Sequence, residues 1–300
     1  MTELVIRALT ESDAHLFHTL ADPGLVGRVV TGIEYRTVAE GGDYRPEWTY
    51  LALRDGKVVA RGAWWGGPDD TTPVNINWFD FADGEQEAGT ELLRRAPFDV
   101  EYELILPPDW REHPATLAAG EARVAAAEAA GKRVLAERCR YEWTPGQGLP
   151  ERPGRLVFRE EQDDQVLLDV LRRISSATLD AHALHATAEH GLDKAAQEDL
   201  DFIRWCPEAW PQLAFTPGGE LVGLHLPCRV PSGHAAGYIG VVPEQRGHGY
   251  AYDLVVESTH FLVERGVTRI VAATDDGNFP MLANFAKAGY PVVQKRIDLI

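Results

Sequence analysis

A chain of 300 residues fits two ordinary domains better than one large domain, because single hydrophobic cores stop growing at about 250 to 300 residues. Hydrophobic residues make up 45% of the chain and charged residues 25%, which excludes intrinsic disorder as its main state. The formal charge of −17 repels phosphate backbones and anionic lipids, so we expect no nucleic acid and no membrane as a partner.

The sequence carries no targeting or metal-binding signal. No apolar run approaches the roughly 18 residues that span a bilayer, so we expect a cytoplasmic protein. Cys139, Cys206 and Cys228 stand far apart and favour neither a disulfide framework nor a zinc site. His182 and His185 share a helical face, but no third ligand follows at a usable spacing, so no metal site is predicted. The sequence leaves monomer and homodimer open.

The first half of the chain predicts a strand, a helix and then a series of strands. Alternating apolar residues on both sides of Asp55-Gly56-Lys57 are typical of a β-hairpin. The predicted elements are a strand over 4–7, a helix after 10–13, strands over 48–53 and 58–65, and a strand over 74–81.

Residues 144–154 divide the chain, because Pro and Gly alternate there and no apolar period survives. We therefore predict two domains, residues 1–147 and residues 154–300. The second half repeats the order of the first, which indicates an internal duplication. Its predicted elements are strands over 156–159, 212–216, 221–226, 235–242, 269–274 and 291–297, and helices after 160–164 and over 249–265 and 279–287. This alternation implies an α/β fold with a central mixed sheet.

The segment from Pro243 to Ala251 joins a predicted strand to the start of a predicted helix. Open N–H groups, the helix dipole, two glycines and the positive charge of Arg246 together suit a pyrophosphate. Tyr252 stands where the dinucleotide fingerprint needs Gly or Ala, and no Gly-Lys-Ser/Thr follows for a Walker A loop. The pattern therefore indicates another kind of phosphate ligand.

This segment resembles the acyl-CoA-binding motif of the GCN5-related N-acetyltransferases, Q/R-x-x-G-x-G/A, through Arg246, Gly249 and Ala251. A second motif of the family is matched downstream by Asn278, Met281, Asn284, Phe285, Lys287, Gly289 and Tyr290. The resemblance implies two tandem acyl-CoA N-acyltransferase domains and acetyl-CoA as co-substrate, with no metal.

The resemblance also implies roles for individual residues. The backbone N–H groups of the turn would hold the pyrophosphate, and the N–H of Val241 would donate to the thioester oxygen. Asn278 would contact the pantetheine arm, although it suits a helix N-cap equally well, and Phe285 would pack beside the thioester. The implied cofactor-binding residues are Val241, Val242, Arg246, Gly247, His248, Gly249, Tyr250, Ala251, Asn278 and Phe285.

The chain departs from the family where an amine must lose its proton. Ala235 and Gly237 stand where many members carry Glu or His, and Phe285 replaces the usual Tyr acid. His234 and Tyr238 are the nearest titratable residues and become the catalytic candidates. The sequence thus predicts acetyl transfer to a primary amine of a small molecule, or alternatively a non-catalytic acyl-CoA sensor.

The first half carries an eroded form of the same turn. Gln86 and Gly89 fit the motif, but Glu91 stands where Gly or Ala is needed. Nearby carboxylates would repel a pyrophosphate. We therefore expect a degenerate domain that walls the acceptor pocket, as in tandem acetyltransferases of this family.

Overall fold

The computed structural model describes residues 3–300, which form two compact units. Unit 1 comprises Met1–Glu137 and Gln294–Ile300, and unit 2 comprises Arg138–Val293. The Pro- and Gly-rich segment 144–154, expected to be a linker, lies inside unit 2. Arg152 in this segment is 2.8 Å from both Glu257 and Glu264, and the Pro150 carbonyl is 2.7 Å from His260 Nε2. These contacts hold the segment along one helix, so the unit boundary falls elsewhere.

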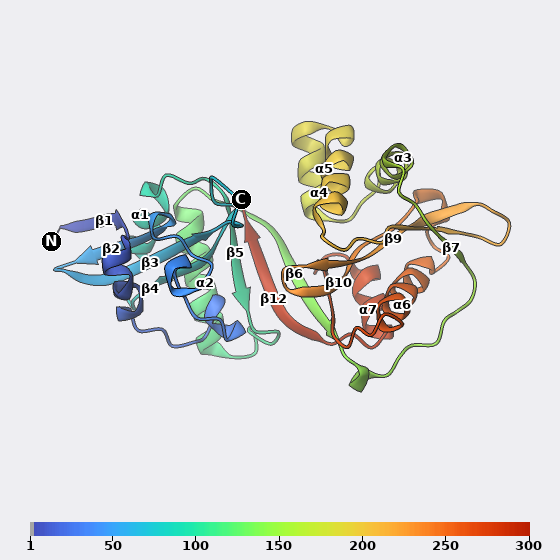
Figure 1. The fold of residues 1–300 in the computed structure, drawn as a ribbon. Helices are drawn as coiled ribbons and strands as arrows, with labels where there is room; N and C mark the ends of the chain where they lie inside the picture. The colour runs from blue at the N-terminus through green and yellow to red at the C-terminus, as the bar shows by residue number, and fades with distance from the viewer. Residues whose placement is uncertain (1–2) are drawn as a thin grey trace. The chain divides into compact units, whose positions relative to one another are not determined.

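Unit 1 is an α/β unit with one sheet of order β1-β2-β3-β4-β5-β12 (Figure 1). Its strands are β1 Leu4–Ala8, β2 Thr49–Arg54, β3 Lys57–Trp65, β4 Asn75–Phe81, β5 Glu101–Leu106 and β12 Val292–Leu299. Its helices are α1 Gln86–Arg95 and α2 Pro114–Ala129, with short 3-10 turns η1 Glu11–Thr19, η2 Arg28–Thr31, η3 Val38–Glu40 and η4 Pro46–Trp48. The helix expected after residue 13 is therefore a 3-10 segment.

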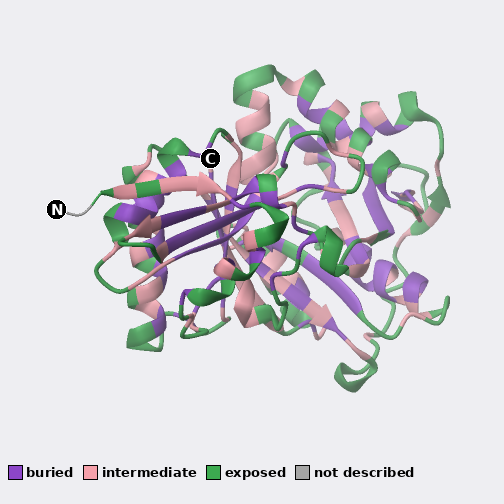
Figure 2. Cartoon of the chain, turned by 60° about the vertical axis from the view of Figure 1, so that its left-hand side comes forward, coloured by how far each residue is buried: buried purple, intermediate pink, exposed green. Residues whose placement is uncertain are grey.

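Both faces of the unit 1 sheet are covered, so successive strand residues enter different cores. Trp64 and Phe79 pack with α1 and α2, whereas their neighbours Ala63 and Trp78 pack with η1. This alternation follows from the two-residue period of a strand. Figure 2 shows the central strands of this unit as buried along most of their length.

Unit 2 repeats the arrangement with the sheet order β7-β8-β9-β10-β11-β6. Its strands are β6 Val134–Trp143, β7 Val157–Glu160, β8 Gln212–Phe215, β9 Leu221–Val230, β10 Gly233–Val241 and β11 Ile270–Asp275. Its helices are α3 Asp164–Ser175, α4 Ala181–His190, α5 Leu192–Trp205, α6 Tyr250–Val263 and α7 Phe279–Lys287, with 3-10 turns η5 Pro145–Gln147 and η6 Pro243–Gln245. Among residues 3–300, no helix combines the length and apolarity needed to cross a bilayer.

Helices cover both faces of the unit 2 sheet, with α3, α4 and α5 on one side and α6 and α7 on the other (Figure 1). Ala235 of β10 packs in the core formed with α3 and α5. The next residue, Ala236, packs in the core formed with α6 and α7. One face of β10 therefore packs against α3 and α5, and the other packs against α6 and α7.

The duplication includes an exchange of strands. In unit 1, the sixth strand is β12, whose residues Lys295–Leu299 pair with β5. In unit 2, the sixth strand is β6, whose residues Arg138–Trp143 pair with β11. Each half of the chain thus completes its sheet with the last strand of the other half.

Candidate active site

Two parallel strands of unit 2 separate after a short paired stretch. Strand β10 pairs with β11 only at His234 and Ala235, and a β-bulge at Gly237 follows. The N–H of Val242 donates to Val222 of β9 at 2.9 Å. Because successive N–H groups of a strand point to opposite edges, the N–H of Val241 points to the edge that β11 has left open. The structure thus places this predicted donor along an unpaired strand edge.

The turn after β10 presents a run of open N–H groups. Gly247 and Gly249 have φ values of 81° and 74°, and Gly249 is the N-cap of α6. Backbone hydrogen bonds of the turn end with Arg246 N to Pro243 O and resume with Tyr252 N to Gly249 O. Between them, in the described part of the chain, the N–H groups of Gly247, His248, Gly249, Tyr250 and Ala251 have no hydrogen-bond acceptor. A helix N-terminus with five such donors suits an anion.

The side chain of Arg246 bonds to backbone carbonyls beside the turn and does not extend over the open N–H groups. Its guanidinium donates to Val241 O at 3.1 Å, to Ile174 O at 3.2 Å and to Ala177 O. Ile174 O and Ala177 O lie at the C-terminal end of α3, where a cation is favourable. The predicted fixed charge therefore stands beside the turn and fastens it to α3.

Arg155 is a second side chain that holds the turn in place, and the sequence analysis did not predict this role. It donates to His248 O at 3.0 Å and Gly249 O at 3.3 Å, and it pairs with the buried Asp253 in the first turn of α6. The hydrogen bond that Arg155 donates to Asp253 raises the pKa of Arg155. Its carbonyl partners lie about 93 residues away along the chain, so no local pattern signals this role.

The remaining predicted cofactor residues are partly structural. Val241 and Val242 are buried, and Phe285 is buried in a stack with Tyr141 whose ring centroids are 4.6 Å apart. Asn278 is the N-cap of α7 and accepts a hydrogen bond from Met281 N at 3.4 Å, which is the other role that its sequence context allowed. Their contacts with a cofactor stay predictions.

The two predicted catalytic residues lie apart. His234 stands at the start of β10, where the strands are still paired, and its Nε2 is 3.8 Å from Glu208. It lines a cavity of about 600 Å³ with Trp210 and Arg265. Tyr238 follows the bulge and packs in the core formed with α3 and α5. The structure therefore brings only Tyr238 to the stretch where β10 and β11 separate.

A base on β10 itself is sterically excluded at one of the expected positions. An added Cβ at Gly237 would overlap Cys228 Sγ.

A carboxylate that the sequence analysis did not predict, Asp199 of α5, lies close to Tyr238. Ser175 Oγ donates to Asp199 Oδ2 at 3.3 Å, and Tyr238 interacts with both residues. The sequence gives no signal for Asp199, because its surroundings in α5 read as an ordinary acidic helix face.

The corresponding region of unit 1 differs from the sequence expectation. Residues 86–91 are not a turn but the first residues of α1, and the connection from β4 spans only 82–85, against 242–249 in unit 2. Gly89 lies inside the helix, where an added Cβ would be 2.6 Å from the Phe81 ring. The glycine therefore permits close helix–sheet packing, which explains why it fits the motif letters without forming the turn.

Strands β4 and β5 of unit 1 also separate after two pairs, but their gap is filled by the chain. Gly27 N donates to Ile105 O of β5 at 2.7 Å, and Gly27 lies next to Asp80 of β4. Val26 is fully buried in the core beside them. Asp22 anchors this segment through an ion pair of 2.8 Å with the buried Arg61.

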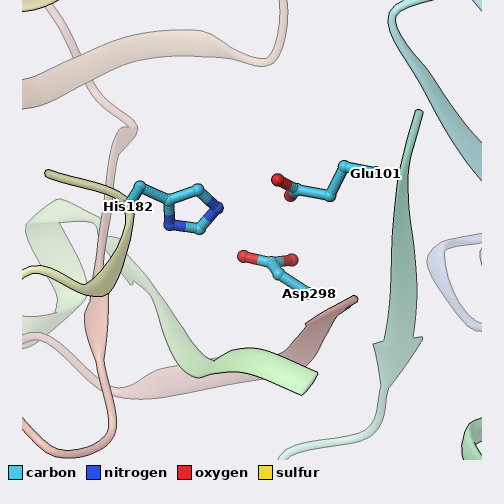
Figure 3. Close-up of side chains that lie close together, drawn as sticks. All are labelled: Glu101, His182 and Asp298. Carbon is cyan, nitrogen blue, oxygen red and sulfur yellow. The ribbon is translucent and has the colours of Figure 1, made fainter. Parts of the chain in front are cut away.

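Figure 3 shows Glu101 and Asp298, which lie on the neighbouring strands β5 and β12 of unit 1 and point their carboxyl groups toward one another. Burial, opposed by Arg296 and reinforced by Glu101, raises the pKa of Asp298 to about 6. The third residue in the picture, His182, belongs to α4 of unit 2. Within unit 1, Asp298 is buried and its carboxylate pairs with Arg296 at 2.6 Å.

Comparisons with known proteins agree with this architecture. Residues 180–290 match the model of the acetyltransferase (GNAT) family. The mycothiol acetyltransferase of Arthrobacter sp. (strain FB24) is 28% identical over 153 residues, which cover 49% of this chain and 45% of that protein. The chain thus matches less than half the length of this curated relative.

Solved structures resemble the whole chain. The crystal structure of a GCN5-related N-acetyltransferase from Sphaerobacter thermophilus has a TM-score of 0.54 at 16% identity, over 99% of this chain and 94% of that chain. The glucosamine N-acetyltransferase region of a fungal multi-domain GH3 β-N-acetylglucosaminidase has a TM-score of 0.54 at 13% identity, over 100% of this chain and 38% of that chain. These likenesses concern the fold.

The separated strands and the glycine turn at a helix start, together with the family match, define a GCN5-related N-acetyltransferase fold in unit 2. Unit 1 has the same strand order and the same separation of its fourth and fifth strands. Residues 180–290 thus match the GNAT family, and the two units of the chain have a GNAT-like fold in tandem.

Proposed function

We propose that this chain is an N-acetyltransferase that moves an acetyl group from acetyl-CoA to the primary amine of a small molecule by direct attack. Unit 2 alone carries out the reaction. The observation that supports this most strongly is the row of five open N–H groups at the end of a strand whose edge is unpaired. The turn suits the pyrophosphate, and the open edge of β10 suits the amide groups of a pantetheine arm.

The chain's own groups have defined tasks in this reaction. The N–H of Val241 stabilises the oxyanion that forms at the thioester carbonyl, since a preorganised dipole needs no reorganisation. Arg246 and Arg155 hold the turn in the conformation that aims its N–H groups outward. Unit 1 binds no coenzyme A, because Val26 and Gly27 occupy the corresponding gap.

A non-catalytic acyl-CoA sensor is the second candidate. The observation that favours it is the absence of a titratable side chain at Ala235 and Gly237 of β10. Both candidates predict acetyl-CoA binding, whereas only the enzyme releases free thiol. Thiol release from acetyl-CoA, measured across a panel of small primary amines, separates them: release with at least one amine supports the enzyme, and none with any amine contradicts it.

The binding site is tested by Gly247→Asp. The new carboxylate would stand beside the diphosphate, and like charges about 4 Å apart repel by about 1 to 4 kcal/mol, depending on solvent exposure. We expect acetyl-CoA affinity, measured by calorimetry, to fall by about tenfold or more.

The matched control is Gly266→Asp at the other end of the same helix. Gly266 has a φ of 82° against 81° for Gly247, and at both positions an added Cβ meets open space. Both substitutions therefore carry the same backbone strain, and only the first should weaken binding. Equal acetyl-CoA affinities in the two variants would show that the turn is not part of the binding site.

A further inference from the structure

Strand β10 carries no proton-accepting side chain at Ala235 or Gly237. A base from another element would have to reach the face of β10 on which such a side chain would lie. Ala235 and Tyr238 both pack in the core formed with α3 and α5, so they share that face despite the bulge between them. Gly240 lies on it too, because an added Cβ there would be 2.6 Å from Ile174 of α3. The acceptor side of the separated strands is therefore lined by α3 and α5.

Asp199 is the carboxylate that α5 presents to this face. It is half-buried, accepts a hydrogen bond from the buried Ser175 of α3, and interacts with the hydroxyl group of Tyr238. Three elements, α3, α5 and β10, thus hold one carboxyl group next to the point where β10 leaves β11.

The surroundings of Asp199 favour a proton acceptor that works near neutral pH. Burial, reinforced by the charges of Asp180 and Glu198 and opposed by hydrogen bonds from Ser175 and Tyr238, raises the pKa of Asp199 to about 7. A base is most effective when its pKa lies near the working pH. Tyr238 cannot take this role, because burial raises its pKa well above the ordinary value and keeps the hydroxyl protonated.

We propose that Asp199 is the general base that removes a proton from the acceptor ammonium group, with Tyr238 and Ser175 as positioning residues. The inference rests on the acetyl transfer proposed above. Asp199 takes one proton from the ammonium group, and the neutral amine attacks the thioester carbon. The C–N bond forms, the C–S bond breaks, and the second amine proton passes to the thiolate. Asp199 then releases its proton to water.

The first test compares Asp199→Asn with Asp201→Asn, a matched change on the exposed face of the same helix. We expect kcat/KM to fall by about 100-fold or more in Asp199→Asn and to stay unchanged in Asp201→Asn. Thermal stability and acetyl-CoA affinity should persist in both variants, because Asp199→Asn removes a partly desolvated charge and keeps the shape.

The second test uses the pH profile of kcat/KM. The wild type should gain activity as the pH rises through about 7, since the base must be ionised. Tyr238→Phe removes a hydrogen bond that lowers the pKa of Asp199, so this rising limb should move to higher pH. A residue with only a packing role would lower activity at every pH and leave the limb in place.

The outcomes separate the two proposals. A wild type that binds acetyl-CoA and turns over an amine, together with an equally active Asp199→Asn variant, overturns the base and leaves the reaction intact. A wild type that releases no thiol with any amine overturns both. An unmoved limb in Tyr238→Phe contradicts the proposed positioning role.

Discussion

At the scale of single residues, Arg155 has two functions: it orients the turn and it neutralises a buried carboxylate. It donates to the carbonyls of His248 and Gly249, which orients the N–H groups of the turn outward. It also neutralises Asp253, a buried carboxylate close to the proposed diphosphate. Without this partner, the negative charge of Asp253 would oppose the ligand.

Arg155→Ala should therefore weaken acetyl-CoA binding and lower the free energy of unfolding by about 1 to 2 kcal/mol. The value lies at and below the lower end of the range for charged hydrogen bonds, because Arg155 is partly exposed and solvent screens its ion pair. Calorimetry and urea unfolding measure the two effects. Arg152→Ala is the control, since Arg152 pairs with Glu257 and Glu264 on the same helix. If both variants bind acetyl-CoA equally well, Arg155 does not brace the turn.

The sequence predicted the positions of the glycines but not the directions of the charged side chains. Gly247 and Gly249 are recognisable because the strand, turn and helix pattern is local. Arg246 bonds to carbonyls 69 and 72 residues away, and Asp199 meets a strand residue far along the chain. Such partners are set by tertiary packing, which one-dimensional spacing does not encode.

At the scale of elements, the apolar periods of the second half predicted its strands and the helices α3, α6 and α7 to within a few residues, but α5 was not predicted. The helix expected over 249–265 is α6, Tyr250–Val263, and that expected over 279–287 is α7 with the same bounds. The prediction of a turn over 86–91 was wrong, because the motif letters there also satisfy an amphipathic helix. The bulge at Gly237 was not predicted either, since a one-residue insertion leaves no periodic trace.

Gly89→Ala tests the packing role of α1. The added methyl group meets the Phe81 and Phe79 rings, and overpacking costs about 1 to 3 kcal/mol, partly offset by about 1 kcal/mol of helix propensity. We expect a lower melting temperature and unchanged acetyl-CoA affinity, measured by calorimetry. Glu87→Ala on the exposed face of α1 should change neither quantity. A loss of affinity in Gly89→Ala would instead assign unit 1 a part in coenzyme binding.

At the scale of the whole molecule, the exchange of β6 and β12 could not be predicted from sequence. Alternating residues predicted a strand over 291–297, and the structure has β12 over Val292–Leu299. The pattern indicates a strand but not its neighbour, because pairing partners can lie anywhere in the chain. The predicted domains 1–147 and 154–300 therefore place each final strand with the half that precedes it, whereas the compact units do not.

Deletion of residues 294–300 should destabilise unit 1, although that unit is formed mainly by the first half of the chain. Ile297 and Leu299 are buried in its core, and loss of each such side chain costs about 2 to 5 kcal/mol. Limited proteolysis should then cut first within residues 3–137. Val293→Ala, at an exposed position of the same strand, is the control. Cleavage that starts in residues 138–293 would contradict the strand assignment.

The strand exchange also has a consequence for synthesis on the ribosome. A nascent chain that has reached residue 147 holds β1 to β5, yet the edge of β5 still lacks its partner. That edge has unpaired backbone groups of the kind that recruit strands from other chains. It stays open while a further 146 residues, 148–293, are added. Newly made chains should therefore depend on chaperones until β12 emerges, more than chains whose domains finish one after the other.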